Sequence, residues 1–115
     1  MGLIRFLRAI AVRRKQRSIL RAIESSSVRY SDSPGISLEN PVVITGAGDD
    51  MIGSMAIFVW LIRKRGTMHV DFRLLGKRGY SEGDRHVDVY TIQSRSGVDE
   101  TFYFDITESW GKIGS

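Results

Sequence analysis

Two histidine–aspartate pairs are the residues of this sequence best suited to proton transfer or metal binding. They occur as His69-Val70-Asp71 and His86-Val87-Asp88, each in a segment where apolar and polar residues alternate. Successive side chains of a strand point to opposite faces, so each histidine shares a face with its aspartate. Imidazole and carboxylate groups bind metals and transfer protons. The pairs are therefore candidates for a metal or acid–base site on one face of a hairpin.

The expected strand pairing argues against both kinds of site. If the apolar faces of the two strands match, Leu74 lies opposite Val87 and Arg73 lies opposite Asp88. The two histidines then lie near opposite ends of the ladder, and neither has a nucleophile or base partner at a recognisable spacing. We therefore predict a solvated sheet face with a cross-strand Arg73–Asp88 pair. We expect no catalytic residue, metal site or cofactor.

A glycine-rich turn after residues 42–45 raises the question of nucleotide binding. The run Val42-Val43-Ile44-Thr45-Gly46-Ala47-Gly48 resembles the opening strand and turn of short-chain dehydrogenases. A G-x-G-x-x-G turn needs a third glycine where this chain has Met51. The next segment is predicted to be a strand, not the helix whose N-terminus binds the pyrophosphate. A plain turn is expected.

The positive charge of the chain is concentrated at its N-terminus. Residues 1–40 carry 8 basic and 3 acidic side chains, a net +5, whereas residues 41–115 carry 9 and 10, a net −1. Residues 1–23 contain no acidic residue, and this Arg-rich, amphipathic composition is typical of a mitochondrial presequence. The basic groups suit anionic lipid headgroups, RNA phosphates or acidic grooves on partner proteins.

A membrane surface or a protein partner is favoured over RNA. RNA binding favours exposed aromatic residues among the charges, and most aromatic residues here lie in predicted strands. The residues predicted to contact a partner or lipid are Phe6, Leu7, Ile10, Arg13, Arg14, Lys15, Arg17, Arg21, Arg63, Lys64 and Arg65.

The fold class predicted is α+β, with an N-terminal helical segment packed on a four- to five-stranded antiparallel meander. Residues 1–25 form a basic helical arm of two helices with a hinge at 13–18. A polar linker spans 26–40, a sheet domain 41–110 and a tail 111–115. The predicted strands are Pro41–Thr45, Met55–Lys64, Thr67–Leu75, Arg85–Gln93 and Thr101–Thr107, with a glycine-rich loop at Gly76–Asp84.

Length and composition exclude several classes of protein. A chain of 115 residues is too short for a multidomain enzyme or a TIM barrel. It contains no cysteine, which excludes disulfides, thiolate metal sites and a cysteine nucleophile. Its longest apolar run, residues 55–62, is well below the roughly 18 residues of a membrane-spanning helix.

The predicted strands resemble a domain family shared by two mitochondrial proteins. These are the twenty-first Tim subunit of the presequence translocase and the first Coa assembly factor of cytochrome oxidase. The resemblance covers roughly Pro41–Glu108 and lies in the order of short segments. They are Met68–Gly76, Gly79, Gly83, Val87–Tyr90 and Phe102–Ile106. It implies a helix before a small antiparallel sheet, and a non-enzymatic module that docks to inner-membrane complexes. The family normally carries a membrane span ahead of the domain, which this sequence lacks.

The sequence therefore predicts a non-enzymatic accessory or assembly subunit of a mitochondrial inner-membrane complex of the respiratory chain. Its partners would be other protein subunits, with anionic lipid at the N-terminal arm and no small-molecule substrate. Two alternatives remain open. One is a mitochondrial ribosomal protein whose arm contacts rRNA, and the other is a small α+β enzyme that uses His69 or His86.

Overall fold

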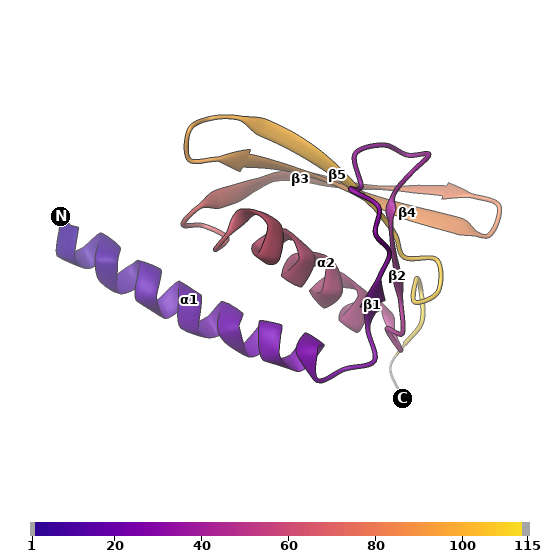
Figure 1. The fold of residues 1–115 in the computed structure, drawn as a ribbon, viewed down its shortest axis with the longest axis horizontal. Helices are drawn as coiled ribbons and strands as arrows, with labels where there is room; N and C mark the ends of the chain where they lie inside the picture. Colours follow the sequence, from indigo (N-terminus) through magenta and orange to yellow (C-terminus); the bar gives the residue numbers. More distant parts are fainter. Residues whose placement is uncertain (1, 114–115) are drawn as a thin grey trace.

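The protein is one mixed sheet covered on one face by a helix, with a second helix packed on the first (Figure 1). The computed structural model describes residues 2–113, apart from the side chain of Phe6. The elements are α1 (Gly2–Glu24), β1 (Arg29–Tyr30), β2 (Val42–Thr45), α2 (Asp50–Arg65), β3 (Phe72–Glu82), β4 (Arg85–Ser94) and β5 (Asp99–Asp105). The sheet order is β1-β2-β5-β4-β3. The α+β class is confirmed, but β2 runs parallel to β5, so the sheet is not the antiparallel meander that was predicted.

Helix α1 is continuous, so the predicted hinge at residues 13–18 is wrong. Arginine, lysine and glutamine are good helix formers, and residues 13–18 include no glycine or proline that would break the helix. The side chain of Gln16 lies within the packed part of α1, where its amide donates to the Met68 carbonyl and accepts from the Met68 N–H. The apolar face changes along α1 because only its C-terminal half packs on the body of the protein.

The predicted strand at Met55–Lys64 is part of helix α2. The carboxylate of Asp49 caps the helix by accepting from the N–H of Ile52 at 2.8 Å, and Gly66 ends it with φ of 98°. The helix is apolar on several sides because it lies between the sheet and α1, and a short buried helix and a buried strand share that pattern. Helix α2, not the N-terminal segment, covers the sheet.

The helix also corrects the interpretation of the glycine turn. Strand β2 is followed by a turn and then by α2, so the expectation that a strand follows the turn is wrong. The spacing argument against a dinucleotide site stands, because Met51 occupies the position of the third glycine.

The predicted linker 26–40 takes part in the domain. It contains β1, which pairs with β2, and its later part crosses the face of the sheet away from α2. Gly35 accepts from the N–H of Tyr103, and the Leu38 carbonyl accepts from the guanidinium of Arg85. The segment therefore contacts the central strand β5 and the start of β4.

The predicted register of the hairpin is also wrong. Strand β3 begins at Phe72 and continues to Glu82 through the predicted loop Gly76–Asp84. Leu74 pairs with Ile92, and Arg73 pairs with Gln93 instead of Asp88. A bulge between Leu74 and Gly76 shifts the alternation of β3 by one residue, so that Gly79 and Ser81 lie opposite Asp88 and His86. Asp88 itself shares a face of β4 with the core residues Tyr90 and Ile92.

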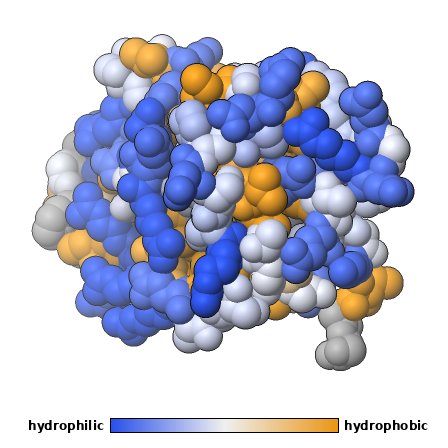
Figure 2. All heavy atoms as spheres, turned by 45° about the vertical axis from the view of Figure 1, so that its right-hand side comes forward, coloured by the Kyte–Doolittle hydropathy of each residue, from blue (hydrophilic) through white to orange (hydrophobic). Residues whose placement is uncertain are grey.

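The surface is largely hydrophilic in the view of Figure 2, with apolar side chains in separate small groups. Within residues 2–113, none of the helices is both long enough and apolar enough to cross a membrane.

Candidate functional site

The first turns of α1 extend beyond the rest of the molecule (Figure 1). In this segment Leu3, Ile4 and Leu7 are 69%, 61% and 55% exposed. With about 3.6 residues per turn, these side chains lie broadly opposite the stripe that packs on the body, which includes Ile19 and Ile23. The protein therefore exposes a second apolar face on α1 that its own core does not use.

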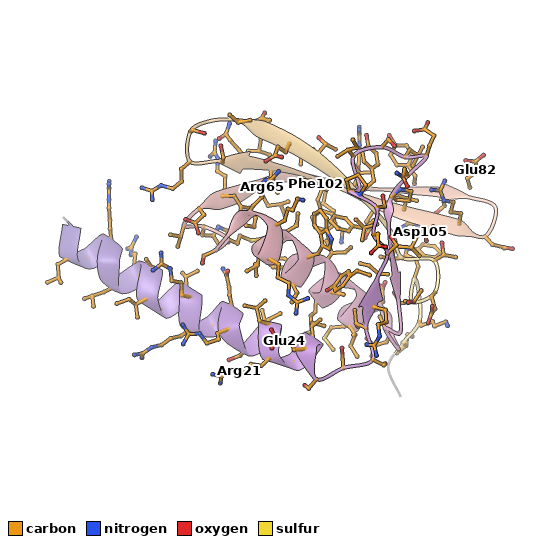
Figure 3. The ribbon with its side chains drawn as sticks, in the orientation of Figure 1. Arg21, Glu24, Arg65, Glu82, Phe102 and Asp105 are labelled. Carbon is orange, nitrogen blue, oxygen red and sulfur yellow. The ribbon has the colours of Figure 1, made fainter. Side chains whose placement is uncertain are left out.

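Basic side chains continue this exposed face toward the C-terminal end of α1. The basic members of the predicted set that lie on α1 are all exposed: Arg13, Arg14, Lys15, Arg17 and Arg21. Arg21 points away from the body of the protein (Figure 3). Of the predicted apolar anchors, Leu7 is exposed and Ile10 is half-buried, whereas the side chain of Phe6 lies outside the described residues. Most of the predicted arm thus forms one continuous apolar and basic surface.

The second predicted basic cluster, Arg63-Lys64-Arg65, is divided by the fold. The guanidinium of Arg65 forms two hydrogen bonds with the Glu100 carboxylate, one of 2.6 Å, and lies over the ring of Phe102 (Figure 3). Arg63 forms an exposed 3.5 Å ion pair with Glu24, and Lys64 lies 5.9 Å from the centre of the Trp60 ring. Arg65 is therefore a structural residue that joins α2 to β5.

The Arg65–Glu100 pair should make stability depend on pH. Hydrogen bonds from Arg65 lower the pKa of Glu100 from its ordinary value of 4.5. A lowered folded-state pKa stabilises the protein above the unfolded-state pKa, and this contribution disappears as the pH falls through the folded-state value. Glu100→Gln should therefore cost roughly 1 kcal/mol near neutral pH and almost nothing in strong acid.

Urea unfolding of the original chain and of Glu100→Gln, near neutral pH and in strong acid, measures the loss of stability under each condition. Glu82→Gln is the matched control, since Glu82 is exposed and takes part in no ion pair within the described chain. An equal loss for Glu100→Gln at both pH values would contradict the assignment.

His86 lies in a buried network, so the predicted solvated face with an Arg73–Asp88 pair is wrong. The Nε2 atom of His86 is 3.0 Å from the Asp88 carboxylate, and its Nδ1 atom is 2.7 Å from the Ser81 hydroxyl. The ring stacks on Trp110 at 4.3 Å between centroids, and it also lies close to Gly79. His86 and Asp88 are only 8% and 5% exposed.

Serine, histidine and aspartate are the residue types of a hydrolytic triad, but here they hold structural elements together. Ser81 lies on β3, His86 and Asp88 on β4, and Trp110 in the C-terminal segment. A β-carbon on Gly79 would lie 3.1 Å from the imidazole, so glycine leaves room for the ring. The geometry therefore supports a lock between the β3–β4 hairpin and the C-terminal segment.

Sequence reasoning missed Ser81, Gly79 and Trp110 as partners of His86. The dipeptide Gly83-Asp84 could have revealed two of them, because a two-residue hairpin turn between Glu82 and Arg85 places Ser81 opposite His86 and Gly79 opposite Asp88. Trp110 gave no such signal, because its contact depends on the path of the C-terminal segment.

His69 lies elsewhere, in the turn between α2 and β3, and its side chain is exposed. The two histidines therefore do not form one site. Among the described residues, no group of three or more histidine, cysteine or acidic side chains could hold a metal ion.

No protein-family model, curated protein or solved structure matches the chain. Fold and surface together define a small α+β domain with a basic, partly apolar N-terminal helix.

Proposed function

We propose that this protein is a non-enzymatic accessory or assembly subunit that docks on an anionic membrane surface through α1. The observation that carries the proposal is the exposed apolar face of Leu3, Ile4 and Leu7, which continues into exposed basic side chains. An interfacial helix combines these two features, because its apolar side chains enter the headgroup boundary while its cationic groups attract anionic lipid.

The energetics of the surface favour this docking. Full burial of one leucine side chain contributes about 1.5–3 kcal/mol. Each basic residue near an anionic leaflet contributes about 1 kcal/mol. Residues 1–23 contain no aspartate or glutamate, so no side-chain carboxylate within this segment opposes the attraction.

The mitochondrial inner membrane is the membrane we propose, with a respiratory-chain complex as the assembly. The support is the Arg-rich, acid-free composition of α1 and the resemblance of the segment order to the inner-membrane family. The sheet would then present the protein to neighbouring subunits while α1 lies on the lipid.

RNA is the less favoured partner of the same helix. Binding to single-stranded RNA uses aromatic side chains on which bases stack. Phe6 is the single aromatic residue between positions 2 and 24 of the sequence. The apolar groups exposed on α1 are aliphatic, which suits acyl chains better than bases.

A comparison of two single substitutions tests the apolar contact. Leu3→Ser should weaken binding to phosphatidylcholine vesicles that contain phosphatidylglycerol by roughly fivefold, or about 1 kcal/mol. Ile36→Ser is the matched control, because Ile36 is 67% exposed and Leu3 is 69% exposed. Vesicle co-sedimentation measures both affinities.

Equal affinities for the two variants would contradict docking through α1. Absence of vesicle binding by the unsubstituted protein, with tight and salt-sensitive binding to RNA, would favour the ribosomal alternative.

A further inference from the structure

A second basic feature lies at the end of the molecule from which α1 extends. The turn between α2 and β3 and the turn between β4 and β5 both lie at this end (Figure 1). Between them is a hollow of about 230 Å³, lined by His69, Arg73 and Arg95 together with Gln93, Ser94 and nearby apolar groups. Neither arginine takes part in an ion pair within the described chain.

The walls of the hollow are held by hydrogen bonds. The N–H of Arg95 donates to the Asp71 carbonyl at 3.2 Å, which joins the two turns. The N–H of His69 donates to the Phe72 carbonyl at 2.6 Å. The Nε and Nη2 atoms of Arg73 both donate to the Gln93 side-chain oxygen, at 2.9 and 2.7 Å, which orients the guanidinium.

Two carboxylates lie near this cluster, and both are already engaged. Asp99 accepts from the Gln93 amide at 2.9 Å, and Asp71 accepts from the N–H of Thr67 at 2.7 Å. The two guanidinium groups keep N–H donors that these bonds do not use, and Ser94 and His69 add further polar groups. The hollow therefore combines positive charge with several donors.

We infer that this hollow binds a phosphate group, and that a phospholipid headgroup supplies it. Planar guanidinium forks match the geometry of phosphate oxygens, and two arginines line this hollow together with a histidine. The lipid source rests on the proposed function, whereas the phosphate chemistry does not. Gln16 of α1 forms two hydrogen bonds to Met68, the residue before His69. These bonds attach the docking helix to the turn that forms one wall of the hollow.

The test removes both arginines and compares the result with an equal loss of charge elsewhere. Arg73→Gln/Arg95→Gln should weaken binding to phosphatidylglycerol-containing vesicles by roughly thirtyfold, from two basic contacts. Arg29→Gln/Arg78→Gln is the control, since both arginines are exposed and neither lines the hollow. The control pair should retain an affinity close to that of the unsubstituted protein.

Inorganic phosphate is the second probe, followed through the imidazole NMR signals of His69. In the unsubstituted protein these signals should shift with phosphate concentration, and the shift should be lost in Arg73→Gln/Arg95→Gln. A phosphate-dependent shift without vesicle binding would support the site with a soluble phosphate source, while the membrane proposal would fail. Equal vesicle affinity for the two double variants, together with no phosphate-dependent shift, would overturn the inference even if Leu3→Ser still weakens docking.

Discussion

Substitution of Arg13, Arg14 and Arg17 by glutamine should weaken binding to anionic vesicles by on the order of a hundredfold. All three side chains are exposed, and no ion pair in the described chain involves any of them. Each contributes about 1 kcal/mol when it lies near an anionic leaflet. The same variant should bind uncharged phosphatidylcholine vesicles as the original chain does. Co-sedimentation over a range of salt concentrations should show a weaker salt dependence for the variant.

The matched control removes three positive charges from the sheet and the C-terminal segment. Arg29→Gln/Arg78→Gln/Lys112→Gln has the same net charge as the α1 variant, and all three side chains are exposed. A comparable loss of affinity in both variants would show that overall charge, not α1, determines binding, and docking through the helix would be wrong.

His86→Ala should lower the free energy of unfolding by about 3 kcal/mol. The substitution removes the bonds to Ser81 and Asp88 and the stacking on Trp110. It also removes the hydrogen-bond partner nearest to the Asp88 carboxylate, which is 5% exposed in the unsubstituted protein and lies 4.0 Å from the Lys77 ammonium. A buried carboxylate that loses a hydrogen-bond partner is strongly destabilised, so the effect should exceed that of one lost hydrogen bond even with Lys77 still nearby. Urea denaturation measures it.

The control for this variant is His69→Asn. His69 is exposed and has a φ of 68°, a left-handed conformation that asparagine tolerates better than most residues. It should change stability by a few tenths of a kcal/mol at most. A His86→Ala protein as stable as the His69→Asn protein would refute the structural lock and would return attention to a chemical role for Ser81 and His86.

Strand positions were predictable where one strand has a simple alternating pattern. The segments predicted at Pro41–Thr45 and Arg85–Gln93 correspond closely to β2 and β4. Helix α2 was not recognised because burial between two layers removes the polar face that identifies a helix. Asp49 before the apolar run was the available signal, since its side chain caps the helix.

The register of β3 could not be obtained from alternation alone. A single extra residue at Leu75 reverses which side chains face α2, and nothing in the local pattern marks that bulge. His86 and Asp88 were predicted to face solvent because Val87 and Val89 marked the other face of β4 as the buried one, whereas the structure buries both faces of residues 86–90. The parallel pairing of β2 with β5 is likewise a contact between segments far apart in the chain.

In the candidate site, too, the sequence predicted some features and only the structure showed the others. Exposure of the basic residues of α1 followed from their number and from the absence of acidic neighbours. The structure separated Arg65 from the other predicted residues, because Glu100 lies within reach of its guanidinium. It also brought His69, Arg73 and Arg95 to one hollow through the turns that carry them.

The sequence by itself determined that the N-terminal segment is a basic, partly apolar helix and that the remainder is a nearly neutral α+β domain. Charge and helix-forming tendency are local properties of a segment, so composition and spacing are sufficient to reveal them. The tertiary structure decided which helix covers the sheet, that both faces of β4 are buried and which basic groups remain free. These depend on contacts between residues distant in the chain, and a one-residue bulge or a single ion pair is enough to change them.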